Sequence, residues 1–419
     1  MTVLDQPRSD RPTIDFDHWS ASYRENWERL AAEFHATGRP LAWSEHHGGF
    51  WVCASWEGVQ RVAAEWETFT SVNDLDGTEN GGRGQVIPQQ PYRLFLGESD
   101  PPLHTGRRRL EAPFFTPKAL RRWRPVTRRF LAEAINSVIE TGRANLIDDI
   151  IVPTTARTTL HVLGYDTDDW QDPAAVAHRG SYLTADHPDY PHGEQARMRA
   201  RFRDLLGERA RNPTGDLISA LAGGVVQDRP LSLDEGESMM NALVFGGFDT
   251  TVSITASSLI WLDQHPEQAV RVREDSDYRA GAIEEFLRFW PPATHVSRTA
   301  VRDTELLGQP IAAGERVAMW LAGANRDPRT FPNPDVIDLE RTNARDHVSF
   351  SAGHHRCLGS PLAKVEIDEM LATIGQALAD LRVDHAAVVT YPSFGGILGY
   401  SQVPVTFTPG RPLPLDDLG

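Results

Sequence analysis

A short stretch near the C-terminus, residues 350–359, holds the side chain best suited to chemistry. It contains Cys357, one of only two cysteines in the 419 residues, with glycines on both sides. A thiolate is a strong iron ligand, and N–H groups at a helix start stabilise its charge. Ser360 and Pro361 suit the N-cap and first turn of a helix, and apolar residues then repeat at helical spacing over 367–381. The stretch predicts an iron-binding thiolate, although a cysteine before a helix is, taken alone, more often a buried structural residue.

A second candidate for chemistry is the pair Asp249-Thr250. A carboxylate beside a hydroxyl can hold protons and pass them to a reacting group. A threonine inside a helix can also simply bond the carbonyl oxygen four residues earlier. Both interpretations stay open on the sequence of the pair alone.

The pair lies within a long apolar segment that predicts one helix over residues 232–264. Ser232 and Glu235 form a capping box at its start, and the helix would be roughly 50 Å long. Gly246 and Gly247 each cost about 1 kcal/mol relative to alanine in a helix interior. We therefore expect another group to approach the helix backbone there, with tight helix packing as the alternative.

The composition limits the classes of function. The chain has 42 Lys and Arg against 58 Asp and Glu, a net charge of −16, which argues against a nucleic-acid partner. Two distant cysteines give no disulfide framework, and no signal peptide or membrane span is apparent, so we expect a monomeric cytoplasmic protein without a membrane partner. Basic clusters at 107–109 and 121–124 suggest docking of an acidic partner, with a solvated helix face as the alternative.

The elements that must position these residues are mostly helices. Helical patterns cover roughly 117–141, 146–163, 169–183, 193–212 and 214–222, and alternation around Gly48-Gly49 predicts a hairpin over 41–55. Two irregular segments, 71–100 and 184–193, are candidate lids. No linker divides the chain, so we predict a flexible arm over 1–20, one domain over 21–410 and a tail over 411–419.

The spacing of Phe350, Gly353, Cys357 and Gly359 resembles the haem-binding loop of the cytochromes P450. His355 matches a histidine often found two residues before the iron ligand. Arg356 departs from the pattern, because that position is usually apolar. The resemblance implies that Cys357 binds the iron of haem b.

Other motifs keep register with this loop. Glu285 and Arg288 match the family's Glu-x-x-Arg, and the proline-rich coil 327–341 resembles its meander, with Arg341 as third partner and Ile337 where phenylalanine is usual. A buried Arg–Glu–Arg set of this kind costs about 3–5 kcal/mol to break.

The haem carries two propionates that need cationic partners. His104 and Arg108, four residues apart, match the family's His-x-x-x-Arg. Arg298 and His355 match two further propionate contacts. For each residue alone, an ordinary surface cation is the alternative.

The resemblance implies a mainly α fold with small β-sheets (α+β), a triangular helical prism around a buried haem, closest to the soluble bacterial, camphor-hydroxylase-like branch. It implies a monooxygenase that activates O2, with Asp249 and Thr250 delivering protons. Electrons would come from a separate ferredoxin and an NAD(P)H-dependent ferredoxin reductase, docking near Arg108 and Arg356.

The substrate is expected to be a mainly apolar small molecule, such as a terpenoid, an aromatic compound or a natural-product intermediate. By register with the family, Ala242, Phe245, Thr294, Ile397 and Leu398 would contact it. Two alternatives remain: an oxidase of the same family that couples aromatic rings, and a haem sensor or carrier that performs no oxidation.

Overall fold

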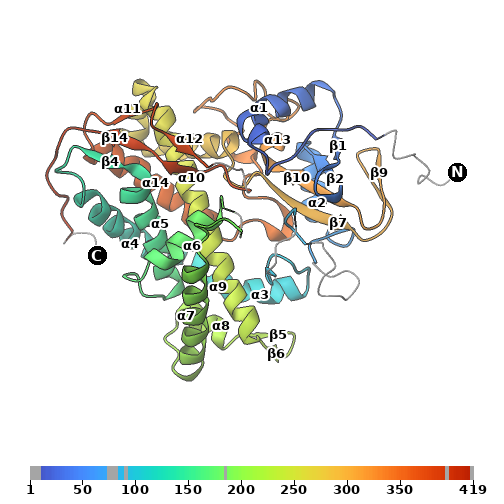
Figure 1. Cartoon of the computed structure of the whole chain (residues 1–419), viewed down its shortest axis with the longest axis horizontal. Coiled ribbons are helices and arrows are strands. Elements are labelled where there is room, and N and C mark those ends of the chain that lie inside the picture. Colours follow the sequence, from blue (N-terminus) through green and yellow to red (C-terminus); the bar gives the residue numbers. More distant parts are fainter. Residues whose placement is uncertain (1–10, 73–83, 89–92, 184–185, 392–395, 416–419) are drawn as a thin grey trace.

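Helices dominate the computed structural model, which describes residues 11–72, 84–88, 93–183, 186–391 and 396–415 (Figure 1). The predicted class, mainly α with small sheets, is confirmed. The helices are α1 (Ala21–Ala36), α2 (Trp56–Ala64), α3 (Leu103–Glu111), α4 (Pro117–Asn136), α5 (Val152–Leu163), α6 (Gln171–Gly180), α7 (His192–Arg211), α8 (Leu217–Ala222), α9 (Leu233–Gly247), α10 (Asp249–Asp263), α11 (Pro266–Glu274), α12 (Ser276–Phe289), α13 (Leu321–Ala324) and α14 (Ser360–Ala377).

The largest sheet lies on one side of the molecule, beside α1 and α2 (Figure 1). Its order is β1-β2-β10-β7-β3, and only the β2–β10 pair is parallel. Its strands are β1 (Leu41–Ser44), β2 (Phe50–Cys53), β10 (Arg316–Trp320), β7 (His295–Ala300) and β3 (Phe69–Thr70). The predicted hairpin is therefore present as β1–β2.

Four small sheets lie outside this one. A three-stranded sheet orders β11-β14-β4, and three two-stranded sheets pair β12 with β13, β5 with β6 and β8 with β9. Their strands are β4 (Arg143–Asn145), β5 (Val225–Val226), β6 (Arg229–Pro230), β8 (Thr304–Leu306), β9 (Gln309–Ile311), β11 (Arg382–Val383), β12 (Val389–Thr390), β13 (Tyr400–Gln402) and β14 (Pro404–Thr406).

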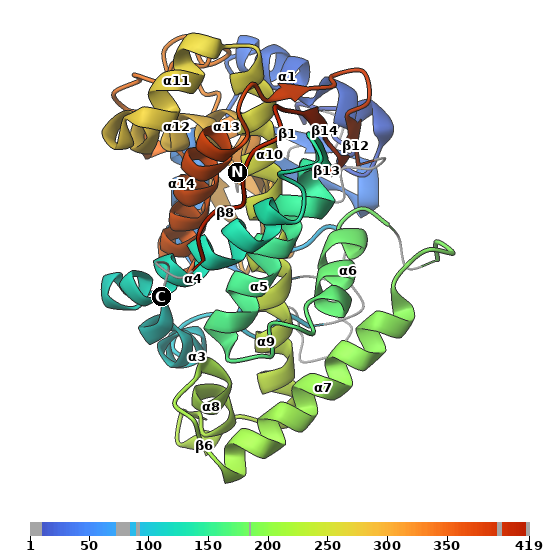
Figure 2. The ribbon, with the colours of Figure 1, turned by 90° about the vertical axis from the view of Figure 1, so that its left-hand side faces the viewer.

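The long central helix is interrupted, where the sequence predicted one continuous helix. The capping box of Ser232 and Glu235 starts α9 as expected, but Phe248, at φ −90° and ψ −74°, separates α9 from α10. By length and composition Leu233–Asp263 could span a membrane, yet 67% of its apolar window is buried. Its apolar character is that of a core helix, which runs through the middle of the molecule in Figures 1 and 2. Figure 2 also shows α7 running past α6 and α8 at the edge.

The N-terminal segment corrects the expectation of a flexible arm over 1–20. Thr13 bridges Trp43 of β1, and the Ile14 N–H donates to the Trp43 carbonyl at 2.9 Å. Phe16 and His18 are 0% and 1% exposed. The described part of the arm is packed because its few apolar side chains alternate toward the core, while residues 1–10 lie outside the described residues.

Candidate functional site

The Cys357 loop forms a tight turn between η6 (Gly353–His355) and α14. The Cys357 N–H donates to the Phe350 carbonyl at 2.8 Å, and N–H groups of Gly359 and Ser360 face the sulfur. The Cys357 side chain is exposed, yet partial desolvation by its surroundings raises the pKa of the thiol, whereas those N–H groups and the charge on Arg108 act in the opposite direction. The helix begins one residue earlier than predicted, because Gly359 is the N-cap and Ser360 is the first helical residue.

Gly353 is needed for a different reason from the expected one. Its φ is +63°, and a Cβ there would clash with the carbonyl oxygen of Ala63 at the end of α2. The glycine therefore seats the loop against α2. The sequence expectation that it makes room for a flat cofactor finds no support in these contacts.

Unpaired cationic and imidazole groups gather beside the Cys357 loop. Neither ring nitrogen of His104 has a hydrogen-bond partner among the described residues, although His104 is 2% exposed. Its ring centroid lies 5.0 Å from that of His354, whose Nε2 is also buried without a partner. Arg298 is 1% exposed and donates only to the Ser297 carbonyl, at 2.8 Å, among described residues, while burial lowers its pKa to about 10.

Orphaned buried donors of this kind call for an explanation. An anionic group lying between His104, His354 and Arg298 would satisfy them, as the carboxylates of a haem would. The donor set therefore fits the cofactor implied by the resemblance. His354 was not among the predicted residues, because spacing alone does not show which of two adjacent histidines has a free nitrogen.

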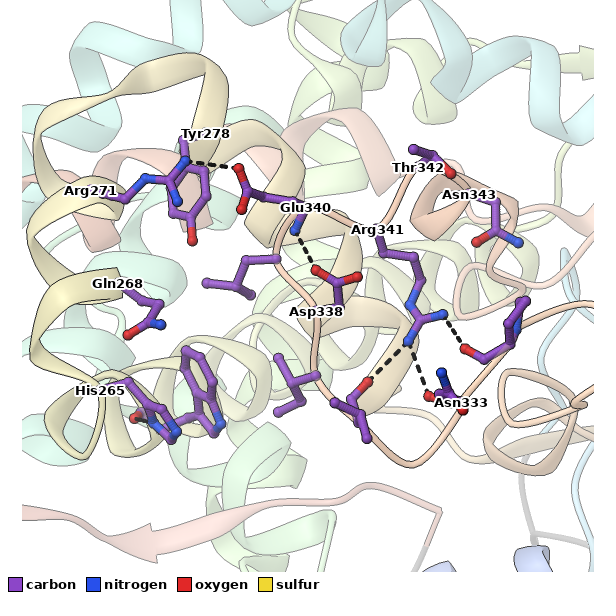
Figure 3. Close-up of a pocket in the computed structure, with 15 residues that line it drawn as sticks. His265, Gln268, Arg271, Tyr278, Asn333, Asp338, Glu340, Arg341, Thr342 and Asn343 are labelled. Carbon is purple, nitrogen blue, oxygen red and sulfur yellow. Dashed lines mark hydrogen bonds and ion pairs between the residues drawn. The ribbon is translucent and has the colours of Figure 1, made fainter.

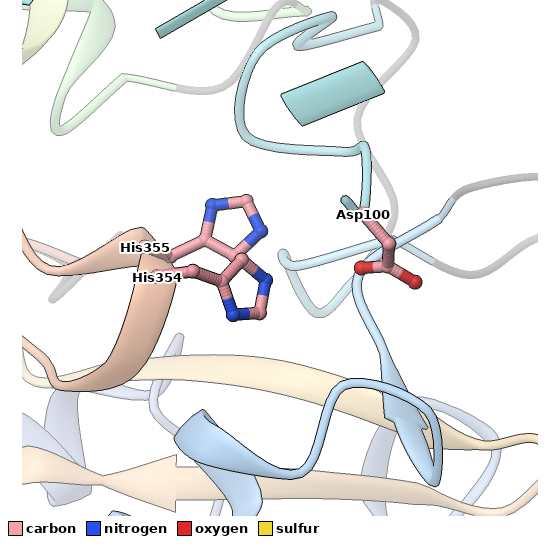
Figure 4. Close-up of side chains that lie close together, drawn as sticks. All are labelled: Asp100, His354 and His355. Atoms are coloured by element: carbon pink, nitrogen blue, oxygen red, sulfur yellow. The ribbon is translucent and has the colours of Figure 1, made fainter. Parts of the chain in front are cut away.

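Asp100, His354 and His355 bring possible metal ligands within 4.8 Å of one another (Figure 4). The Asp100 carboxylate, however, accepts from the Thr70 hydroxyl and, at 2.8 Å, from the Ser71 hydroxyl. His355 Nε2 lies 3.0 Å from the same Ser71 hydroxyl. These hydrogen bonds already use the Asp100 carboxylate and the His355 imidazole. We therefore interpret the three residues as a hydrogen-bonded part of the site rather than as a metal site, with His355 held by Ser71.

Arg108 joins α3 to the Cys357 loop. Its Nη2 donates to the Arg356 carbonyl at 2.7 Å. Arg356 itself is exposed, lies 5.9 Å from the ring of Phe350 and donates to the Ser360 hydroxyl at 3.3 Å. Arg356, the residue that departs from the family pattern beside Cys357, thus connects Phe350 at one end of the turn to α14 at the other.

The three charged residues predicted to hold the meander meet as one set. Arg288 donates to Glu285 at 2.7 and 2.8 Å, and Arg341 Nε lies 3.1 Å from each Glu285 oxygen. Side chains of Glu285 and Arg288 are 0% exposed, and that of Arg341 is 7% exposed. Other guanidinium N–H groups donate to backbone carbonyls, that of Val336 in the meander and that of Asn325 just before it.

A cavity of about 670 Å³ lies next to this set, between the meander and helices α10 to α12 (Figure 3). It contains an Arg271–Glu340 ion pair at 3.0 Å, and Arg341 reaches from its wall to the Asn333 carbonyl. Of the predicted site residues only Arg341 lines it. The cavity is therefore separate from the residues gathered around Cys357.

Space opens at the break between α9 and α10. A Cβ on Gly246 would meet no atom within 4 Å, whereas one on Gly247 would lie 2.7 Å from the Thr159 hydroxyl oxygen of α5. Gly247 therefore fits the alternative of tight helix packing, while the space at Gly246 leaves room for another group. The Thr250 hydroxyl donates to the Gly246 carbonyl at 2.8 Å, which leaves its oxygen free to accept.

Asp249 is buried, at 1% exposed, and bonded by two residues that sequence reasoning did not find. His178 Nδ1 lies 2.8 Å from Asp249 Oδ1, and the Tyr391 hydroxyl lies 2.6 and 2.7 Å from the two carboxylate oxygens. The Tyr391 oxygen also lies 2.9 Å from His178 Nδ1, and Tyr182 stacks on the Tyr391 ring at 4.4 Å. No local pattern marks these partners.

The predicted substrate contacts separate into two groups. Ala242, Phe245 and Ile397 are half-buried. Thr294 and Leu398 are 1% and 3% exposed, and Leu398 packs within a core cluster with Phe16 and other aromatic residues. The structure thus corrects the expectation for Thr294 and Leu398, because neither presents surface to a ligand.

Comparisons with known proteins identify relatives of this chain. The family model for cytochrome P450 matches residues 198–379. The biotin biosynthesis cytochrome P450 of Bacillus subtilis is 31% identical over 324 residues, covering 76% of this chain and 80% of that protein. Linalool 8-monooxygenase of Pseudomonas putida is 28% identical, covering 78% and 83%. The solved structure of cytochrome P450-153 from Novosphingobium aromaticivorans is 28% identical with a TM-score of 0.81, covering 94% of this chain and 99% of that one.

Proposed function

Because this chain belongs to the cytochrome P450 family and is therefore a haem-dependent monooxygenase, we propose that it oxidises a mainly apolar small molecule with electrons from a separate ferredoxin. The haem, when bound, supplies the activation of dioxygen. The chain's own residues bind and orient the substrate, exclude water and hold protons. Cys357 is proposed as the iron ligand, with Phe350 and Gly359 shaping its loop.

A partly accessible apolar stripe on the core helix carries the proposal for the substrate. Ala242, Phe245 and Gly246 are accessible along α9, although the neighbouring Met239, Met240 and Val244 are buried, and the stripe ends at Thr250. Since this spacing of three to four residues places them on one helix face, a ligand on that face would contact all of them. An apolar substrate lying along it would place a C–H bond near the Thr250 hydroxyl.

A ligand screen on the haem-loaded protein tests this proposal. Binding displaces water from iron and changes the absorbance of the haem, so terpenes, fatty acids and aromatic compounds can be ranked by that change. We expect apolar compounds to give it and charged, sugar-like compounds to give none. Product formation from a hit then requires NADH, the ferredoxin and its reductase, and a hit that consumes NADH without oxidised product would contradict the monooxygenase reaction for that compound.

The ferredoxin is proposed to dock on a surface that contains two exposed arginines, Arg356 and Arg109 of α3. Arg108, next to Arg109 in the chain, connects α3 to this part of the loop through its hydrogen bond to the Arg356 carbonyl. An acidic ferredoxin would be drawn to these cations, and salt would slow its approach. We expect Arg109→Glu and Arg356→Glu to slow reduction several-fold, and Arg211→Glu at the end of α7 to leave it unchanged. Equal rates for all three variants would rule out this surface.

The remaining cofactor contacts are proposed on the same basis. His104, His354 and Arg298 would bind the haem carboxylates through the donors that have no other partner in the described part of the chain, and Arg108 would support the Cys357 loop. Replacing Cys357 with serine tests the ligand. The reduced, carbon-monoxide-bound variant should lose the thiolate-type absorbance, and its persistence would show that another residue binds the iron.

A further inference from the structure

The pairing of His178 with Asp249 places a titratable imidazole between solvent and a buried carboxylate. The His178 side chain is 14% exposed and that of Asp249 is 1% exposed. Nδ1 is the nitrogen that points inward, at 2.8 Å from Asp249 Oδ1. Nε2 has no hydrogen-bond partner among the described residues and is not one of their fully buried unpartnered atoms, so water can reach it.

Chemistry fixes the direction of the bonds in this group. An ionised carboxylate only accepts, so Nδ1 carries a proton and donates to Asp249, and the Tyr391 hydroxyl donates to the same carboxylate. The Tyr391 oxygen, 2.9 Å from Nδ1, can accept a share of that proton. Three side chains thus close a ring of hydrogen bonds in which both Asp249 oxygens are occupied.

We propose that His178 is the proton entry to Asp249, a positioning residue that, with Tyr391, holds the carboxylate until a proton has been transferred. The inference rests on the proposed role of Asp249 in proton delivery. In the transfer, the Nδ1–H bond of the imidazolium breaks and an O–H bond forms at Asp249 Oδ1. The neutral imidazole keeps its Nε2–H, and its bare Nδ1 takes up a proton from hydronium when the ring turns that nitrogen toward water.

The transfer also explains how the acid would be released. Before it, opposite charges attract across a short contact inside the protein. After it, both groups are neutral, so the attraction between opposite charges is gone and the carboxyl group is held only by neutral hydrogen bonds, from its own O–H to His178 Nδ1 and from the Tyr391 hydroxyl. The protonated acid can then turn toward Thr250, which follows it in the chain.

The surroundings of His178 support a proton on the imidazole near neutral pH. Although burial acts against the charge, the bond to Asp249 and the charges of Asp249 and Asp148 raise the pKa of His178, while Arg179 lowers it. Asp148 lies in η4 (Leu146–Ile151). The ring centroid of Tyr182 lies 5.6 Å from that of His178.

Other charged groups on neighbouring helices are already paired. On α7, Glu194 pairs with Arg179 at 2.7 Å and Arg197 with Asp172 at 2.6 Å. On α5, Arg157 pairs with Glu133 at 2.6 Å, and the His161 ring packs against Trp123 and Phe130. On α9, Glu237 pairs with Arg199 and Arg203. Asp249 and Asp148 therefore dominate the charge near His178.

Nuclear magnetic resonance tests the pair without relying on turnover. In the reduced, carbon-monoxide-bound holoenzyme the iron is diamagnetic. The ring signals of His178 are assigned as those that disappear in the His178→Gln variant. We expect them to titrate above the ordinary histidine pKa of about 6.5. In Asp249→Asn the midpoint should fall below that value, because burial remains and the negative charge is gone. An identical midpoint in both proteins would overturn the proposal.

The yield of oxidised product per NADH provides the second readout. In the wild type it should fall as pH rises through the His178 midpoint, while His178→Gln should give a several-fold lower yield that does not vary with pH. His178→Arg keeps a positive charge against Asp249 but cannot release a proton, so its yield should also be low and flat even if the glutamine variant folds poorly. His385→Gln, at an exposed histidine that pairs with Asp263 at 2.8 Å, is the control and should keep the wild-type profile.

Two results separate this inference from the proposed function. If Asp249→Asn keeps the full yield, proton delivery through Asp249 is wrong and the inference falls with it. If Asp249→Asn loses yield while His178→Gln keeps both the yield and pH profile of the wild type, only the inference about His178 is overturned.

Discussion

Gly247 and Thr159 lie in direct contact where α9 crosses α5. A Cβ on Gly247 would lie 2.7 Å from the Thr159 hydroxyl oxygen and 2.8 Å from its methyl carbon, while one on Gly246 would meet nothing within 4 Å. Adjacent glycines therefore serve different purposes. One lets two helices touch, and the other leaves surface for a ligand.

Alanine substitutions separate these two purposes. Gly247→Ala should destabilise the holoenzyme by about 1–3 kcal/mol, the usual cost of overpacking, and Thr159→Ala in the same protein should restore most of it. Gly246→Ala should keep or slightly raise stability but weaken the substrate-induced absorbance change. Urea unfolding and ligand titration measure the two effects, and equal destabilisation by both alanines would contradict the assignment.

Thr250 offers a hydroxyl oxygen that can still accept a hydrogen bond, because its proton is donated to the Gly246 carbonyl at 2.8 Å. Thr250→Val keeps the shape and removes this acceptor, so product per NADH should fall about tenfold or more while NADH consumption continues. The missing electrons should appear as hydrogen peroxide. Thr250→Ser retains a hydroxyl and should keep most of the yield. A wild-type yield in the valine variant would show that Thr250 is only structural.

The parts of the site that sequence could predict are local. The loop around Cys357 and the Glu285–Arg288 pair depend on fixed short spacings, and α14 and the capping box at Ser232 follow from periodicity and cap chemistry. The break at Phe248 could not be predicted this way. The break lies beside the contact of Gly247 with Thr159 and the space at Gly246, which involve other parts of the fold and leave no local pattern in the sequence.

The partners of Asp249 were missed for a related reason. His178 and Tyr391 are 71 and 142 residues away in the chain, and no motif connects them. Long-range pairs of this kind are set by packing. The N-terminal segment shows a milder case, since Ile14 and Phe16 alternate as in a strand, but the run was too short to distinguish from a loose arm.

The buried set around Glu285 predicts a large loss of stability when one partner is removed. Arg341→Ala takes one cation from a carboxylate that is 0% exposed, so we expect a loss of about 3–5 kcal/mol together with easier loss of haem. Arg345→Ala is the control, because the Arg345 side chain is 76% exposed and its contact with Glu284 is long, at 4.0 Å. That variant should change the unfolding free energy by less than about 1 kcal/mol. Equal losses in denaturant unfolding would contradict the importance of burial.

Glu111, at the end of α3, is a buried acid that predicts a pH-dependent stability. It is 1% exposed, both carboxylate oxygens lack partners among the described residues, and burial raises its pKa to about 8, with Arg108 acting in the opposite direction. Between the ordinary value of 4.5 and about 8, the folded chain holds a proton that the unfolded chain has lost. Stability should therefore fall as pH rises through this window, by up to about 1.4 kcal/mol per pH unit.

Glu111→Gln removes this titration while keeping the size of the side chain. Its stability relative to the wild type should improve steadily from pH 5 to pH 8, because only the wild type must either keep its proton or bury a charge. Urea unfolding of the holoenzyme at several pH values measures the difference, and Glu140→Gln, at an exposed glutamate, should run parallel to the wild type. If the Glu111→Gln curve also runs parallel, the Glu111 carboxyl group is either ionised with a partner or open to water, and its burial has no energetic consequence.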